Sequence, residues 1–197
     1  MSSSIIFLDC DGVLANSRAH CCPQWVEGVD AGTLTGLVKL CHWGVDAGKR
    51  LSYADDPTLF PHPENAMVPL ERPCLEQLAR VVRATGADVV LSTSWRLAQG
   101  KRAFLVSALA AYGVRVVGDT PDIATVRRGQ EVAQWIAENR FVGTFVILDD
   151  GHEESFESTA LHSKLVLTTM CAPHEPAGEG LTPALADRAI EVLAARR

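Results

Sequence analysis

Short runs of consecutive apolar residues alternate with longer amphipathic stretches along most of the chain. Four runs are rich in Val, Ile and Leu and end in polar or small residues; they span residues 5–8, 88–91, 114–117 and 144–148, and a weaker fifth run spans 164–167. Near-continuous apolar runs of this length are typical of strands that are buried on both faces. The pattern therefore predicts the strands of a parallel sheet.

Between these runs, apolar residues recur at intervals of three and four, which is the spacing of one face of an α-helix. The four stripes lie at Leu75–Val82, Phe104–Tyr112, Val132–Ile136 and Leu185–Leu193. Gly86 and Gly113 follow the first two stripes and predict the ends of those helices. Strands and helices alternate from about residue 72 onward, which predicts an α/β fold with a doubly wound, parallel, Rossmann-like sheet.

Residues 20–72 interrupt this alternation with five prolines, scattered aromatic residues and several histidines. Irregular connections longer than about 15 residues usually have a function or a structure of their own. We therefore expect a small cap or lid inserted after the first strand, and a core formed by residues 1–19 and 73–197. A long irregular connection is the alternative interpretation.

Composition and charge narrow the class of protein. The 197 residues are 47% apolar and 21% charged, as in a globular domain. The net charge of −6 disfavours binding of nucleic acid through the overall charge of the protein. The sequence shows no signal-peptide pattern and no stretch long enough to span a bilayer, so we expect a cytoplasmic protein that does not bind membranes.

The cysteine and histidine side chains of residues 20–72 are candidate ligands of a zinc ion. The candidate ligands are His20, Cys21, Cys22, Cys41, His42 and His62. Adjacent cysteines rarely bind one ion together, and no Cys-x-x-Cys spacing is present. We expect reduced thiols and surface imidazoles here rather than a metal site or disulfides.

Acidic and hydroxyl side chains follow three of the predicted strands directly. Asp9 and Asp11 follow the first strand, residues 92–94 (Ser-Thr-Ser) the second, and Asp149 and Asp150 the fourth. Ligands of an open parallel sheet bind at the carboxyl ends of its strands, so these side chains should meet. Clustered carboxylates need a cation, and oxygen ligands favour Mg²⁺. A simple turn explains either Asp-rich segment alone, but not both.

Such a cluster can perform phosphoryl chemistry. A carboxylate shielded by a metal ion can attack phosphorus and form an acyl-phosphate. A second carboxylate can protonate the leaving oxygen and afterwards activate water.

Residues 8–14 (Leu-Asp-Cys-Asp-Gly-Val-Leu), 89–93 (Val-Val-Leu-Ser-Thr) and 146–150 (Val-Ile-Leu-Asp-Asp) resemble, in this order, the first, second and fourth motifs of the haloacid dehalogenase (HAD) superfamily. The resemblance covers residues 5–18 and 73–170. It implies that Asp9 is the nucleophile and Asp11 the general acid and base. It also implies that Mg²⁺ is held by Asp9, the Asp11 backbone carbonyl, Asp149 and, through water, Asp150.

The same resemblance implies a phosphate-binding set. Thr93 takes the hydroxyl role with Ser94 as its helper, and Ser92 is the alternative register. The third motif of the superfamily supplies a basic residue, usually Lys, for which this chain offers Arg127 or Arg128. Arg128 is better placed, at the head of a predicted helix, and the alternative is an arginine that only faces solvent.

A narrower resemblance links the chain to HAD domains associated with RNA-repair proteins and to their stand-alone bacterial relatives. Its residues are 92–96 (Ser-Thr-Ser-Trp-Arg), Arg128, Glu131, Val132, Trp135 and 148–150 (Leu-Asp-Asp). It implies phosphatase chemistry that extends to nucleic-acid ends. Trp95 could then stack a base and Arg96 bind a phosphate; the alternatives are core packing for Trp95 and pairing of Arg96 with a surface acid.

We therefore expect a phosphomonoester hydrolase that acts on a small phosphorylated metabolite or nucleotide, with substrate selection in residues 20–72. One alternative is a polynucleotide-end phosphatase that removes a 3′-phosphate in nucleic-acid repair. The alternative of another class is a non-catalytic module that binds phosphate or a partner.

Overall fold

The structure of this chain is a computed structural model, and it describes residues 4–15, 59–60, 70–123, 127–151, 153–156, 159–169 and 180–195. The zinc candidates of the sequence analysis lie outside the described residues; they are His20, Cys21, Cys22, Cys41, His42 and His62. Most of the predicted cap, residues 20–58 and 61–69, lies outside them as well.

Five parallel strands form the central sheet, in the order β5-β4-β1-β6-β7. Their bounds are Ser4–Leu8 for β1, Asp88–Leu91 for β4, Val116–Asp119 for β5, Thr144–Asp149 for β6 and Leu165–Leu167 for β7. Leu8 pairs with Leu91 on one side and with Leu148 on the other, so three strands end at the same level. The strand order reverses at β1, which is the switch point where open parallel sheets bind ligands.

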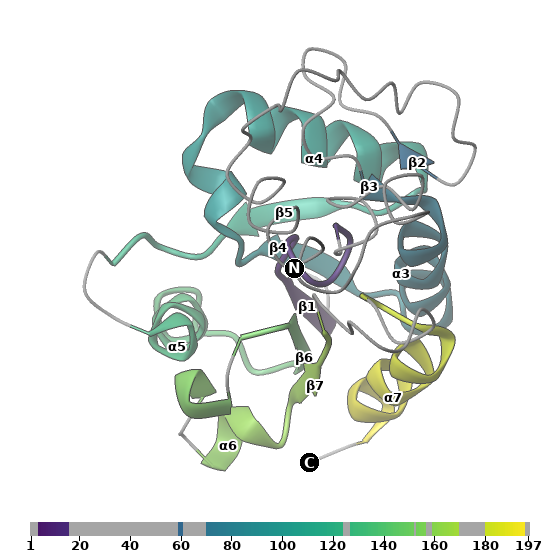
Figure 1. Cartoon of the computed structure of the whole chain (residues 1–197). Coiled ribbons are helices and arrows are strands. Elements are labelled where there is room, and N and C mark those ends of the chain that lie inside the picture. Colours follow the sequence, from purple (N-terminus) through teal and green to yellow (C-terminus); the bar gives the residue numbers. More distant parts are fainter. Residues whose placement is uncertain are drawn as a thin grey trace, which may run out of the picture.

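Helices cover both faces of this sheet (Figure 1). The longer ones are α3 (Arg72–Thr85), α4 (Gln99–Ala111), α5 (Arg128–Glu138) and α7 (Pro183–Ala194). The short ones are η3 (Ser94–Leu97), η4 (Glu153–Phe156) and α6 (Thr159–His162). Gly86 ends α3 in the left-handed conformation that its sequence position predicts.

Alternate residues of β1 face the two layers of helices. Ile6 and Leu8 lie in one apolar cluster with residues of α3, α4 and α7, whereas Ile5 and Phe7 lie in a second cluster with residues of α5 and α6. This alternation follows from the pleat of a strand. The predicted doubly wound α/β fold is confirmed.

The edge strand β5 differs from the prediction. It begins two residues later than the apolar run at 114–117 and is not buried on both faces, since Val117 is 44% exposed. Val114 is buried although it precedes the strand. An edge strand pairs with one neighbouring strand only and is partly exposed to solvent. The apolar residues of such a strand therefore do not mark where it begins and ends, as they do for a central strand.

The chain leaves and re-enters the described core beside the end of β1. Leu59–Phe60 (β2) and Leu70–Glu71 (β3) form an antiparallel pair. The Glu71 N–H donates to the Leu14 carbonyl at 2.7 Å, which joins β3 to the turn after β1. The division into a core and a cap at residues 20–72 stays a prediction. No helix within the described residues has the length and apolarity needed to cross a bilayer.

Candidate active site

A tight turn directly after β1 carries the first two acids. Asp9 still pairs with β6, because its N–H donates to the Leu148 carbonyl at 2.9 Å. The Cys10 carbonyl then accepts the N–H groups of residues 13–15, which closes the turn. Gly12 has a φ of 73°, and a Cβ at this position would overlap the Asp150 carboxylate. Only glycine satisfies both the backbone angle and this close approach.

Three carboxylates converge at the carboxyl ends of β1 and β6. One oxygen each of Asp9, Asp149 and Asp150 lies within 4.8 Å of the others. Burial, followed by repulsion from Asp149, raises the pKa of Asp9 from 3.8 to about 7. Burial also raises the pKa of Asp149, and it raises that of Asp150 to about 6. Without a cation, the cluster therefore retains protons at pH values where ordinary aspartates have none.

The donor set of this cluster fits a hard divalent cation. All three groups offer carboxylate oxygens, which Mg²⁺ prefers. The two oxygens of Asp149 are in different situations: Oδ1 accepts the Gly151 N–H at 2.7 Å, whereas Oδ2 is buried and has no hydrogen-bond partner among the described residues. A bound cation would satisfy that oxygen.

Arg128 faces the same acids from the first residue of α5. Its Nη1 lies 3.7 Å from Asp9 Oδ1, and its Nε lies 4.0 Å from Asp149 Oδ2. Both distances are too long for hydrogen bonds, and Nη1 is buried without a hydrogen-bond partner among the described residues. The guanidinium can therefore still donate to an anion, at a helix N-terminus that itself favours negative charge. Arg127, the other candidate, is exposed and precedes the helix.

The hydroxyl residues after β4 lie in three different environments. Ser92 is fully buried, its N–H donates to the Leu8 carbonyl at 2.8 Å, and its Oγ has no partner among the described residues. Thr93 is also fully buried, and its Oγ1 accepts the Trp95 N–H at 3.2 Å and so caps η3. Ser94 is exposed. The structure thus places this segment beside the end of β1, next to Asp9.

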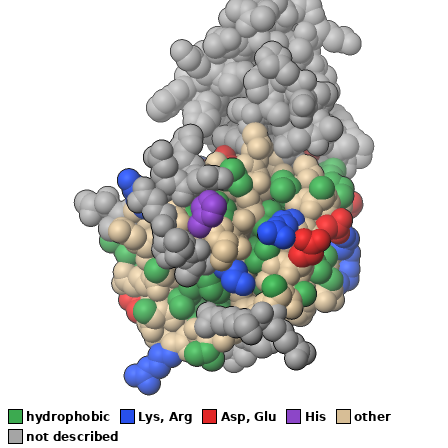
Figure 2. Space-filling view, turned by 90° about the horizontal axis from the view of Figure 1, so that it is seen from below, with side chains coloured by type: hydrophobic (Ala, Val, Ile, Leu, Met, Phe, Trp, Pro, Cys, Tyr) green, Lys and Arg blue, Asp and Glu red, His purple; other side chains and the backbone are tan. Residues whose placement is uncertain are grey.

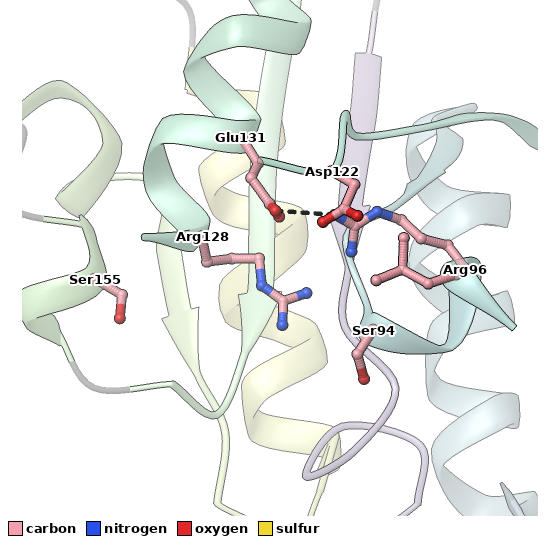
Figure 3. Close-up of a pocket in the computed structure, with 7 residues that line it drawn as sticks. Ser94, Arg96, Asp122, Arg128, Glu131 and Ser155 are labelled. Atoms are coloured by element: carbon pink, nitrogen blue, oxygen red, sulfur yellow. Dashed lines mark ion pairs between the residues drawn. The ribbon is translucent and has the colours of Figure 1, made fainter. Parts of the chain in front are cut away.

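Arg96 ties this segment to α5. Its guanidinium donates to the carbonyls of Thr93 at 2.7 Å, Thr120 at 2.9 Å and Pro121 at 3.0 Å, and its Nη2 pairs with Glu131 at 3.0 Å (Figure 3). Arg96 and Glu131 are 9% and 8% exposed. Of the two roles weighed for Arg96, the structure shows pairing with an acid, but this acid is buried, whereas the sequence analysis expected a surface acid.

Trp95 is buried rather than presented to a base. It is 3% exposed, and the Lys101 ammonium lies 5.3 Å from its ring centroid. The base-stacking interpretation is therefore wrong, and core packing is correct. The indole N–H donates to Asp11 Oδ2 at 3.0 Å, a contact across 84 positions of the chain that no sequence spacing indicates.

A polar cavity of about 330 Å³ opens beside Arg128 (Figure 3). Its lining residues are Ser94, Arg96, Leu97, Asp122, Arg128, Glu131 and Ser155. Ser94 and Arg128, two of the residues expected to bind phosphate, thus line one cavity. Sequence reasoning missed two of the lining residues, because neither belongs to a motif: Asp122 lies in the loop after β5 and Ser155 lies in η4.

The family described as "HAD domain in Swiss Army Knife RNA repair proteins" matches residues 5–172. No curated protein and no solved structure matches the chain.

Proposed function

This chain belongs to the family of HAD domains in Swiss Army Knife RNA repair proteins, and this membership supports a hydrolase of the phosphatase type. We propose that it hydrolyses phosphomonoesters with Mg²⁺ through an aspartyl-phosphate on Asp9. The observation that carries the proposal is the convergence of Asp9, Asp149 and Asp150 with the Arg128 guanidinium at the ends of β1 and β6. The three carboxylates can bind a cation, and the guanidinium can bind a phosphate beside it.

The raised pKa of Asp9 supports a metal requirement. With a pKa of about 7 in the absence of metal, Asp9 is about half protonated near neutral pH, and a protonated carboxyl is a poor nucleophile. Asp9, Asp149, the Asp11 backbone carbonyl and, through water, Asp150 would hold Mg²⁺. When bound, the ion neutralises the acids and the phosphate, and so keeps Asp9 ionised.

The proposed reaction has two steps. In the first, an Asp9 carboxylate oxygen bonds to phosphorus, the ester P–O bond breaks, and Asp11 gives its proton to the leaving oxygen. In the second, Asp11 removes a proton from water, the new hydroxide attacks phosphorus, and the bond from phosphorus to Asp9 breaks to release inorganic phosphate. Thr93, Ser94 and Arg128 hold the phosphate oxygens in both steps.

The substrate we propose is a small phosphorylated metabolite or nucleotide, consistent with the net charge of −6. On the face shown in Figure 2, the Lys and Arg side chains of the described residues are separate from one another or adjacent to acids. The family match favours a second candidate, the phosphorylated end of a polynucleotide, since the matching domains belong to RNA repair proteins.

Phosphate release from a panel of esters tests the proposal. The panel contains sugar phosphates, nucleotides, a 3′-phosphorylated oligonucleotide and an aryl phosphate, each with Mg²⁺ and with EDTA. We expect turnover only with Mg²⁺, loss of turnover in Asp9→Asn, and full turnover in Asp187→Asn, a matched change on the exposed surface of α7. Turnover by Asp9→Asn would contradict the mechanism, and no turnover of any ester would favour a non-catalytic binding module.

A further inference from the structure

Trp95 contacts two parts of the proposed machinery at once. Its indole N–H donates to Asp11 Oδ2 at 3.0 Å, and its backbone N–H donates to Thr93 Oγ1 at 3.2 Å. Asp11 lies in the turn after β1 and Thr93 follows β4, so a single residue links the ends of two neighbouring strands.

We propose that Trp95 is a positioning residue that orients the Asp11 carboxyl group for proton transfer to the leaving oxygen. This inference rests on the proposed function. A hydrogen-bond donor on one carboxylate oxygen leaves the proton to the other oxygen. With Oδ2 fixed by the indole, Oδ1 is the oxygen that carries the proton, and it is held in one direction.

The surroundings of Trp95 make this orientation rigid. The ring is 3% exposed, it packs beside Phe104 at a centroid distance of 6.4 Å, and the Lys101 ammonium lies over it. The next residue, Arg96, fixes the backbone of η3 through three carbonyls and the Glu131 carboxylate. The direction of the indole N–H is therefore set by the core, and a rigid partner of this kind holds a catalytic group more accurately than a mobile surface side chain.

The role predicts a dependence on the leaving group. A general acid matters most when the leaving oxygen is strongly basic, as in an alkyl phosphate, and least when it is weakly basic, as in 2,4-dinitrophenyl phosphate. Trp95→Phe removes the N–H and keeps an aromatic ring. We expect kcat/KM to fall at least about tenfold for the alkyl ester and less than about threefold for the dinitrophenyl ester, a fraction of the effect of a whole general acid.

Comparing two esters on one preparation separates positioning from folding. A lower folded fraction reduces both kcat/KM values by the same factor, so their ratio reports only the chemistry. Trp135→Phe is the matched control, because Trp135 is a buried tryptophan of the opposite face that packs on Phe7 at 5.3 Å. We expect this control to leave the ratio unchanged.

The outcomes distinguish this inference from the function on which it rests. Wild-type turnover with an unchanged ratio in Trp95→Phe overturns the role of Trp95 alone, whereas absence of wild-type turnover overturns the proposed function and this role with it. The contact itself has a readout without turnover: the ¹⁵N–¹H resonance of the Trp95 indole should shift in Asp11→Asn and stay in place in Asp187→Asn. An unshifted resonance in Asp11→Asn would also overturn the inference.

Discussion

Mg²⁺ should stabilise this protein far more at alkaline than at acidic pH, because the ion must displace protons from the acid cluster. The pKa of Asp9 is about 7 and that of Asp150 about 6, both above the ordinary 3.8. At pH values between 3.8 and these raised pKa values, the metal-free folded protein binds more protons than the unfolded chain does. Its free energy of unfolding therefore falls as the pH rises through this window.

The size of the effect follows from the same two groups. At about pH 8 the carboxyl groups of Asp9 and Asp150 are both ionised. At about pH 5.5 both are largely protonated, and Mg²⁺ must displace these protons, which lowers its apparent affinity about 100-fold. An Mg²⁺ concentration about 100 times the dissociation constant at the higher pH adds about 2.7 kcal/mol to the free energy of unfolding, and the same concentration adds about 0.4 kcal/mol at the lower pH. For a chain of this length these values correspond to increases in Tm of about 5–10 °C and about 1 °C.

Thermal unfolding followed by circular dichroism measures both increments, with Mg²⁺ and with EDTA at constant ionic strength. Asp149→Asn should lose the increment at the higher pH, since Asp149 offers the buried unpartnered oxygen. Asp187→Asn should keep it, because Asp187 lies on α7 outside the cluster. An increment of equal size at the two pH values would refute the reasoning that protons and the cation compete for these carboxylates.

Three further predictions test the parts of the site separately. Arg128→Met should lower kcat/KM by about 100-fold or more by removing a phosphate-binding charge, and Arg127→Met by less than about threefold; equal losses would show that the two arginines were assigned wrongly. Glu131→Ala should lower the free energy of unfolding in urea by about 3 kcal/mol, because it leaves a buried guanidinium without its counter-charge, and a loss below about 1 kcal/mol would contradict that account. Gly12→Ala should abolish the increase in Tm caused by Mg²⁺, because its methyl group displaces Asp150; an undiminished increase would show that this carboxylate is not needed.

The central strands could be predicted from the sequence because burial on both faces leaves an unbroken apolar run. The runs at 88–91 and 144–148 match β4 and β6 to within one residue. The predicted range of the edge strand β5 differs from the observed one by two residues, since Gly118 and Asp119 extend the strand without large apolar side chains. The short elements η3, η4 and α6 have four residues each, too few for a helical period to emerge.

In the site, the sequence indicated the acids and not the contacts that hold them. Asp9 and Asp149 follow central strands directly, so their convergence follows from the parallel topology. The bond from Trp95 to Asp11 and the ion pair between Arg96 and Glu131 join residues far apart in the chain. Which partner a buried indole or guanidinium finds depends on tertiary packing, and no local spacing encodes it.

The central claim is that Asp9 forms the covalent intermediate, and trapping that intermediate tests it most directly. The wild-type protein with Mg²⁺ is mixed with a ³²P-labelled ester that it hydrolyses, quenched in acid within one turnover and digested for peptide mapping by mass spectrometry. The account predicts a phosphorylated peptide whose label lies on Asp9 and which is absent from Asp9→Asn. Release of labelled phosphate with no label on Asp9 at any time before the turnover is complete would contradict it.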